Sequence, residues 1–244
     1  MSAGGSGREG GRALKTRVRS ARKRSLSSTL WLERQLNDPY VARAKLEGLR
    51  SRAAYKLIEI DDKHRLLKPG GRIVDLGAAP GGWAQVAAER VKAREGRGRV
   101  IGVDLKPIEP IAGVEFRVMD FHDPAAPAAL RQWLAGPADG VMSDMAANAT
   151  GHRRTDHLRI VGLAELAAAF AVEALAPGGF FLAKVFQGGA EGALLARLKR
   201  DYAAVRHLKP RASRAESAEV YVLATGFRAA ERSSVEDAEP EQAG

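Results

Sequence analysis

Hydrophobic and polar positions follow two alternating patterns along most of this chain. Short apolar runs predict strands, and longer segments with apolar residues three or four positions apart predict helices. Strands are expected over 72–76, 99–104, 115–120, 139–144, 179–186, 203–208 and 219–225. Helices are expected over 38–48, 51–64, 82–93, 125–134, 158–176 and 190–201.

The alternation of strands with helices predicts an α/β fold. Its sheet should have seven strands, run mostly parallel and be covered by helices on both faces. The last two predicted strands have no helix between them, which predicts an antiparallel hairpin at the sheet edge. The run Ala176-Pro177-Gly178-Gly179 predicts a sharp stop between the long helix and its strand.

The stretch from Val74 to Trp83 indicates a ligand-binding turn between a strand and a helix. Its D-x-G-x-x-x-G-G pattern places Asp75 and Gly77 at the end of the strand, and Gly81 just before the helix. The dinucleotide fingerprint needs a glycine where Ala79 stands. We therefore expect a nucleoside ligand without a pyrophosphate, namely S-adenosylmethionine. The alternative is an ordinary connecting loop.

Four aspartates fall at or just after predicted strand ends: Asp75, Asp104, Asp120 and Asp144. The carboxyl ends of parallel strands share one edge of a sheet, so these side chains should face one site. We expect Asp104 to bind a ribose diol and Asp120 an adenine amino group, with Phe121 beside the ring. Any one of them alone could be a helix cap or a turn residue.

The charge of the chain favours a polyanionic partner. The net charge of the 244 residues is +10, with +7 in 1–25, −4 in 229–244 and +7 in the remainder. We expect 1–25 to be a disordered basic arm and 229–244 a disordered acidic tail, flanking one folded domain over 26–228.

Several classes of protein are disfavoured by composition. The chain has no cysteine, and its five histidines show no metal-ligand spacing, so neither a disulfide nor a metal site is expected. It has no apolar run long enough to span a membrane and no secretory signal. We therefore expect a cytoplasmic protein, and a monomer because no interface stripe is visible.

Lys184 interrupts an otherwise apolar predicted strand. A buried lysine is costly unless it is paired or functional, although one at a strand end can also reach solvent. Lys56 on the helix before the glycine turn, Asp144, and Glu219 at the start of the last strand are the groups considered with it. Spacing alone does not bring these four residues together.

Several segments together resemble the FtsJ/RrmJ family of ribosomal RNA 2′-O-ribose methyltransferases, over about 26–225. They are residues 48–53, 74–83, 141–146, 175–179, 184–188 and 219–221. Two departures are Ala147, where the family usually has proline, and Ala218, where a basic residue is common. The resemblance implies a Rossmann-like S-adenosylmethionine-dependent methyltransferase fold.

The resemblance also implies site residues. The catalytic set falls on Lys56, Asp144, Lys184 and Glu219, and the methyl-donor contacts fall on Gly81, Trp83, Asp104, Asp120 and Asp144. Asp75 and Gly77 of the glycine turn complete the expected cofactor site.

The implied reaction is methylation of a uridine 2′-oxygen in the A-loop of 23S rRNA, on the large ribosomal subunit. We expect Lys184 to be the general base; a free lysine is almost fully protonated at neutral pH, so burial and neighbouring positive charge must favour its neutral form. An RNA-binding approach is expected from basic residues near the site: Arg50, Arg52, Lys209, Arg211 and Arg214.

Three alternatives remain open on the sequence. A related methyltransferase could act on transfer RNA or messenger RNA caps. A nicotinamide-dependent oxidoreductase could use the same architecture, although the missing glycine argues against it. A non-catalytic rRNA-binding assembly factor could keep the fold without the chemistry.

Overall fold

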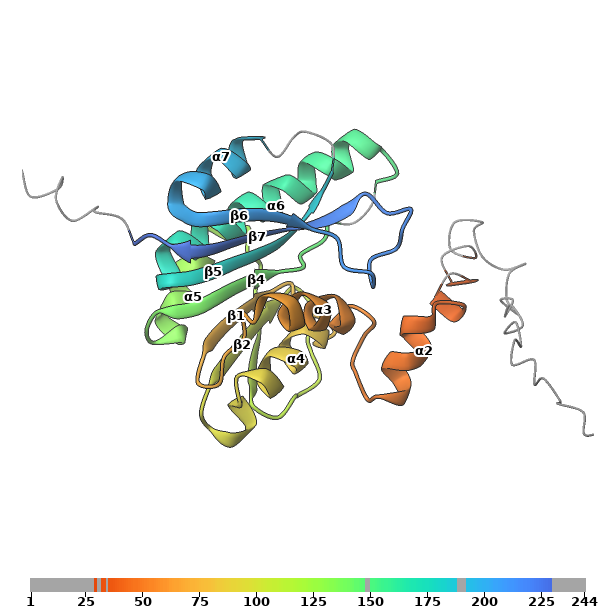
Figure 1. Ribbon diagram of the computed structural model, residues 1–244, viewed down its shortest axis with the longest axis horizontal. Helices are drawn as coiled ribbons and strands as arrows, with labels where there is room; N and C mark the ends of the chain where they lie inside the picture. Colours follow the sequence, from red (N-terminus) through yellow and green to blue (C-terminus); the bar gives the residue numbers. More distant parts are fainter. Residues whose placement is uncertain (1–28, 30–31, 34, 148–149, 188–191, 230–244) are drawn as a thin grey trace, which may run out of the picture.

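The computed structural model describes residues 29, 32–33, 35–147, 150–187 and 192–229, and it has the expected α/β architecture (Figure 1). The helices are α2 (Pro39–Leu46), α3 (Ala54–His64), α4 (Gly82–Arg90), the 3-10 turn η2 (Ala93–Glu95), α5 (Ala126–Leu134), α6 (Arg153–Ala174) and α7 (Gly192–Asp201). The strands are β1 (Arg72–Leu76), β2 (Arg99–Asp104), β3 (Val114–Val118), β4 (Ala138–Ser143), β5 (Leu175–Phe186), β6 (Tyr202–Leu208) and β7 (Glu219–Phe227).

The seven strands form one mixed sheet in the order β3-β2-β1-β4-β5-β7-β6. Neighbouring strands from β3 to β5 pair in parallel, whereas β7 is antiparallel to both β5 and β6. The predicted seven-stranded, mostly parallel sheet with an antiparallel edge hairpin is therefore confirmed. The edge strand of this hairpin is β6, because the final strand, β7, inserts between β5 and β6.

Helices cover both faces of the sheet because successive strand residues point to opposite sides. Val74 and Leu76 of β1 belong to the core beneath α5, α6 and α7. Ile73 packs into the second core, beneath α3 and α4. Asp75 shares the parity of Ile73 and so points into the α3–α4 face, although it is a carboxylate. Figure 1 shows these layers. The helix α2 packs beside α3, where the rings of Tyr40 and Tyr55 lie 5.3 Å apart between centroids.

The bounds of two helices differ from prediction for reasons that the structure shows. The helix expected over 82–93 ends at Arg90, because Lys92 adopts a left-handed conformation (φ 64°) and the Val91 carbonyl accepts from the Gly70 amide at 2.9 Å. The helix expected over 158–176 is α6, which starts earlier, at Arg153. Asp156 in its first turn accepts hydrogen bonds from the Thr150 amide and hydroxyl, at 2.8 and 2.6 Å.

The Ala176-Pro177-Gly178-Gly179 run ends the helix as predicted but lies inside a strand. α6 ends at Ala174, and β5 begins at Leu175, which pairs with Ala138 of β4. The next pair joins Phe180 to Gly140, so the register shifts across the run. The segment is thus a bulge in β5 rather than a separate turn.

The other predicted elements differ from the observed ones by no more than a few residues at either end. The segment expected as a basic arm, 1–25, and residues 230–244 of the expected acidic tail lie outside the described residues, as do 190–191 at the start of the last predicted helix. In the part of the chain that is described, no helix is both long and apolar enough to cross a membrane.

The buried hydroxyl of Tyr202 provides a test of this packing. The side chain is 1% exposed, its ring packs against Phe227 at 5.3 Å, and its hydroxyl has no hydrogen-bond partner among the described residues. Burying an unpaired hydroxyl costs free energy, so Tyr202→Phe should raise the free energy of unfolding by about 1 kcal/mol. Tyr202→Ala should lower it by about 3–5 kcal/mol, because it leaves a cavity. Urea unfolding of the two variants measures both; a destabilised Phe variant would show that the hydroxyl is satisfied.

Candidate active site

The direction of the sheet order reverses at β1. From β1 the chain first builds outward through β2 and β3, and then returns to place β4 on the other side of β1. Parallel α/β sheets bind ligands at such a reversal, beyond the carboxyl ends of the strands. A cavity of about 830 Å³ lies there, in the size range of small-molecule sites.

The walls of this cavity come from the segments that follow four strands. Gly77 follows β1, Asp104 ends β2, Asp120 follows β3 and Asp144 follows β4. Apolar side chains and α6 complete the lining, which includes Val103, Met119, Phe121, Met145, Arg159 and Leu163. A flat apolar group can therefore bind between the walls while the carboxylates accept hydrogen bonds from its polar edges.

The polar groups of the lining indicate what the cavity can bind. Three carboxylates, from Asp104, Asp120 and Asp144, line it together with the basic side chains of Lys106 and Arg159. The carboxylates can accept hydrogen bonds from hydroxyl and amino groups and attract a cation. An adenosine that carries a sulfonium offers all of these groups and therefore fits the lining.

The backbone of the glycine turn approaches the cavity closely at Gly77. Its φ is 78°, and a Cβ atom built on it would lie 2.8 Å from the Met145 Cα. Asp104 holds the turn from the other side, because its carboxylate accepts from the Ala79 amide at 2.9 Å. Asp120 is more exposed, and hydrogen bonds from the His122 amide and ring lower its pKa.

Three other residues expected to contact the cofactor do not line this cavity. Trp83 is buried, its indole N–H donates to the Ala53 carbonyl at 2.9 Å, and its ring packs beside Tyr221. Gly81 has φ 107°, and a Cβ atom there would meet the Ile111 side chain at 2.7 Å. Asp75 is completely buried. Their contacts with a ligand stay a prediction.

Asp75 is a buried acid near the glycine turn. Burial first, and then the charge of Asp144, raise the pKa of its carboxyl from 3.8 to about 8, against a smaller opposing effect of the Ala84 amide. At neutral pH the group is therefore mostly protonated and adds little negative charge beneath the site.

A second cluster of polar groups lies on the α3–α4 face of the sheet. On β5, Phe180 and Leu182 pack into the core of this face, so Lys184 points the same way. On β7, Tyr221 belongs to the same core, and Glu219 has its parity. The register joins the two strands directly, with Lys184 opposite Tyr221.

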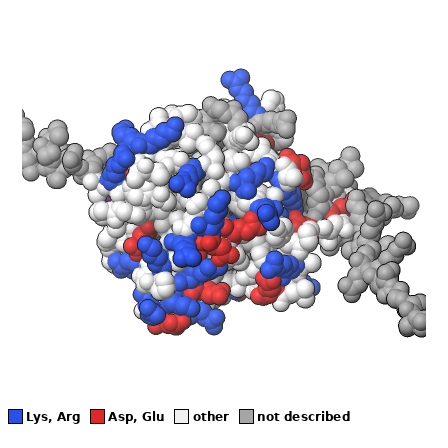
Figure 2. Space-filling model, viewed as in Figure 1, with Lys and Arg blue, Asp and Glu red and all other residues white. Residues whose placement is uncertain are grey.

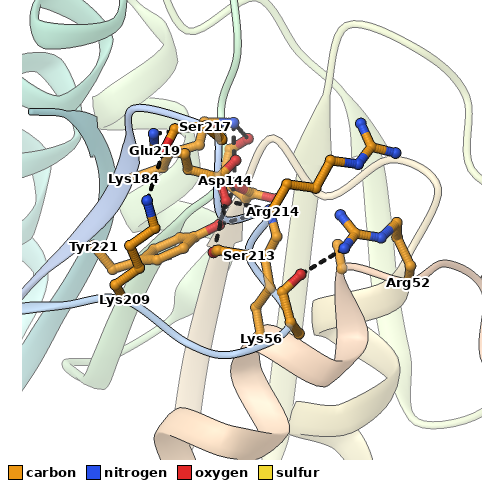
Figure 3. Close-up of polar contacts among 12 residues, drawn as sticks. Arg52, Lys56, Asp144, Lys184, Lys209, Ser213, Arg214, Ser217, Glu219 and Tyr221 are labelled. Carbon is orange, nitrogen blue, oxygen red and sulfur yellow. Dashed lines mark hydrogen bonds and ion pairs between the residues drawn. The ribbon is translucent and has the colours of Figure 1, made fainter. Parts of the chain in front are cut away.

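The four predicted catalytic residues meet in this cluster as two ion pairs (Figure 3). Lys56 of α3 lies 2.6 Å from Glu219 through Nζ and Oε1. Lys184 lies 3.1 Å from Asp144 through Nζ and Oδ1, and it donates to the Asp144 carbonyl at 2.8 Å. Both ammonium groups are almost buried, with side chains 7% and 8% exposed. Asp144 also lines the cavity, so it connects the cluster to the ligand site.

Tyr221 links the two ion pairs and was not predicted to have a role. Its hydroxyl lies 3.0 Å from Lys56 Nζ, 3.1 Å from Asp144 Oδ1 and 3.3 Å from Glu219 Oε1. Burial, followed by the charges of Asp144 and Glu219, raises the pKa of the phenol well above 10. The hydroxyl therefore keeps its proton and can donate it to either carboxylate.

The five predicted RNA-binding residues have different environments. Arg50 donates to the Pro110 carbonyl at 2.8 Å, and Lys209 to the Ser217 carbonyl at 2.6 Å. Arg52 and Arg214 both lie against the buried carboxylate of Asp38, at 2.8 and 3.4 Å. The guanidinium of Arg211 is exposed and has no hydrogen bond or ion pair among the described residues.

Sequence reasoning missed three residues of the site. Tyr221 shares its strand face with Glu219, so the period-two pattern could have indicated it. Ser213 reaches Glu219 from a loop, and Arg159 reaches the cavity from α6. Neither lies in a segment whose pattern specifies where its side chain points.

The buried acid makes stability depend on pH. Between pH 4 and pH 8 the folded protein holds a proton on Asp75 that the unfolded chain releases, so the free energy of unfolding falls as pH rises. Asp75→Asn is neutral throughout. Its stability relative to wild type should rise by roughly 3–4 kcal/mol between pH 5 and pH 8, measured by urea unfolding. Asp62→Asn, on the exposed side of α3, is the control; an equal pH effect in both variants would contradict this origin.

Comparison with known proteins agrees with this geometry. The sequence model of the FtsJ-like methyltransferase family matches residues 49–227. Proteins named ribosomal RNA large subunit methyltransferase E are 67% identical over 217 residues in Azorhizobium caulinodans, covering 89% of this chain and 90% of that one, and 68% identical over 218 residues in Xanthobacter autotrophicus, covering 89% and 86%. A crystal structure described as a ribosomal RNA methyltransferase of Plasmodium falciparum has a TM-score of 0.64 and 31% identity, and the match covers 73% of this chain and 98% of that one. The family match spans the chain from the residues before α3 to the end of β7, the part that builds both the cavity and the lysine–carboxylate cluster, and the chain therefore belongs to the FtsJ-like methyltransferases.

Proposed function

We propose that this protein transfers a methyl group from S-adenosylmethionine to the 2′-oxygen of a uridine in the A-loop of 23S rRNA, on the large ribosomal subunit. The names of its relatives at 67–68% identity support ribosomal RNA as the substrate. The observation that carries the reaction type is the pair of buried lysine–carboxylate contacts beside the cavity.

Lys184 is the proposed general base. S-adenosylmethionine would supply a methyl group that its cationic sulfur already activates. The protein then has to align the ribose and accept one proton from its 2′-hydroxyl. The carboxylate and carbonyl of Asp144 fix the Lys184 amine from two sides, next to the cavity wall. Only the neutral Lys184 amine can accept the proton of the 2′-hydroxyl.

Lys56 and Glu219 are proposed to hold the acceptor ribose. The two side chains form an ion pair with each other. The Tyr221 hydroxyl lies between this pair and the Lys184–Asp144 pair. Three groups contact Glu219 Oε1: Lys56 and Ser213 as donors, and Tyr221, whose single proton is shared with Asp144. No described residue donates to Oε2, so this oxygen is the one we assign to a ribose hydroxyl.

The RNA approach is proposed to lie over the loop between β6 and β7 and the segment before α3. On the face shown in Figure 2, Lys and Arg side chains are spread out with acidic side chains between them, rather than forming one uninterrupted basic patch. Contacts to phosphates would therefore be few. Arg211 is the predicted RNA ligand with a free guanidinium, and the others would first have to leave an internal partner.

The reaction is tested by labelled methyl transfer to large ribosomal subunits that lack their own ribose methylations. Wild type should label one 2′-oxygen in the A-loop. Lys184→Ala should lower kcat by about 100-fold or more, because a general base contributes at least that much, and should leave methyl-donor binding unchanged.

Lys68→Ala is the matched control, because Lys68 is exposed before β1, at the opposite end of the strands. If Lys184→Ala kept most of its activity, the assignment of the base would be wrong. If wild type labelled transfer RNA but not the subunits, the substrate assignment would be wrong while the chemistry stood.

Basic residues without an internal partner should bind RNA more strongly than those that already have one. Arg211→Ala should weaken subunit binding and lower the slope of log affinity against log salt by about 1, because one phosphate contact is lost. Lys209→Ala should leave that slope unchanged, because its ammonium is bound to loop carbonyls. Binding measured between 50 and 200 mM salt gives both slopes. A lower slope in the Lys209 variant alone would reverse the two roles.

A further inference from the structure

The loop between β6 and β7 lies against the catalytic cluster and is held by buried polar contacts. It runs from Lys209 to Ala218, and within it Ala212 and Ser213 are buried. Figure 3 shows Ser213 beside the polar groups of the cluster. A loop of this length is usually solvent-exposed, so burial of two of its residues requires a cause.

One cause is a carboxylate on α3. Glu59 accepts the Arg211 amide at 2.6 Å and the Ala212 amide at 3.0 Å, so both of its oxygens bind the loop backbone. Arg52 donates to the Ala212 carbonyl at 2.5 Å from the segment before α3. The helix that carries Lys56 therefore also fixes the position of Ser213.

Among the described residues, the hydroxyl of Ser213 has one hydrogen-bond partner. Its Oγ lies 3.0 Å from Glu219 Oε1. Since a carboxylate only accepts, Ser213 must donate. The neighbouring Ser217 acts differently, because its hydroxyl accepts from the Glu219 backbone amide at 3.2 Å. Only Ser213 therefore controls the rotation of the carboxylate from the loop.

We propose that Ser213 is a positioning residue, which orients Glu219 toward the acceptor ribose and is itself held in place by Glu59. This inference rests on the proposed role of Glu219. With Oε1 bound by Ser213, Lys56 and Tyr221, the carboxylate cannot rotate freely, and Oε2 keeps one direction. Loss of the serine donor releases one of the three restraints.

A double-mutant cycle tests the inference. Ser213→Ala should lower kcat for subunit methylation about 10-fold, the size of a hydrogen bond to a charged group, and leave the KM for the methyl donor unchanged. In the Glu219→Ala background the same change should cost less than 2-fold, because its target is absent. Ser213→Thr, which keeps the donor, should retain most of the wild-type kcat.

The cycle distinguishes a positioning role from a merely structural role by how the losses in kcat combine. Losses that multiply in the double variant, or an unaffected kcat in Ser213→Ala, would overturn the inference. Glu59→Gln should lower kcat in the wild-type background and have little effect in the Glu219→Ala background, and equal losses in both would remove Glu59 from the chain of contacts. Unfolding midpoints of all variants show that each is folded. Failure of the proposed function is seen separately, as a wild type that transfers no methyl group.

Discussion

Two lysines buried beside a binding cavity impose the main physical constraint on this molecule. Removing an ammonium group from water costs several kcal/mol unless a partner of opposite charge is held at hydrogen-bond distance. Lys56 and Lys184 each have one such carboxylate, supplied by Glu219 and Asp144. The carboxylates come from β7 and from the end of β4, so strand order, register and the placement of α3 must all be correct for the charges to be tolerated.

Much of this arrangement could be predicted from sequence because it follows from periodic patterns. Strand ends of a parallel sheet meet at one edge, which brought Asp104, Asp120 and Asp144 to one cavity. Strand parity could likewise have placed Lys184 and Glu219 on one face. The FtsJ/RrmJ resemblance and the α/β sheet are confirmed, and the four catalytic candidates lie together in the structure.

The parts that sequence did not predict depend on contacts without a period. The start of α6 is stabilised by Asp156, whose partners lie in the preceding loop. The proline–glycine run remains within β5 because β4 accepts it as a bulge. Lys209 is a basic residue near the site and was therefore expected to bind RNA, yet its ammonium donates to a carbonyl of its own loop. In each case the outcome depends on the position of a backbone group that composition does not encode.

The insertion of β7 between β5 and β6 has a consequence for the order in which the protein matures. Lys56 and Tyr221, which contact each other through Nζ and the hydroxyl, are 165 positions apart. The residues that line the cavity extend no further along the chain than Leu166, whereas Glu219 and Tyr221 belong to the final strand. During synthesis, domains generally fold as units. The core beneath α5, α6 and α7 also takes residues from β7, so both the cavity and the lysine–carboxylate cluster depend on the last strand to be translated.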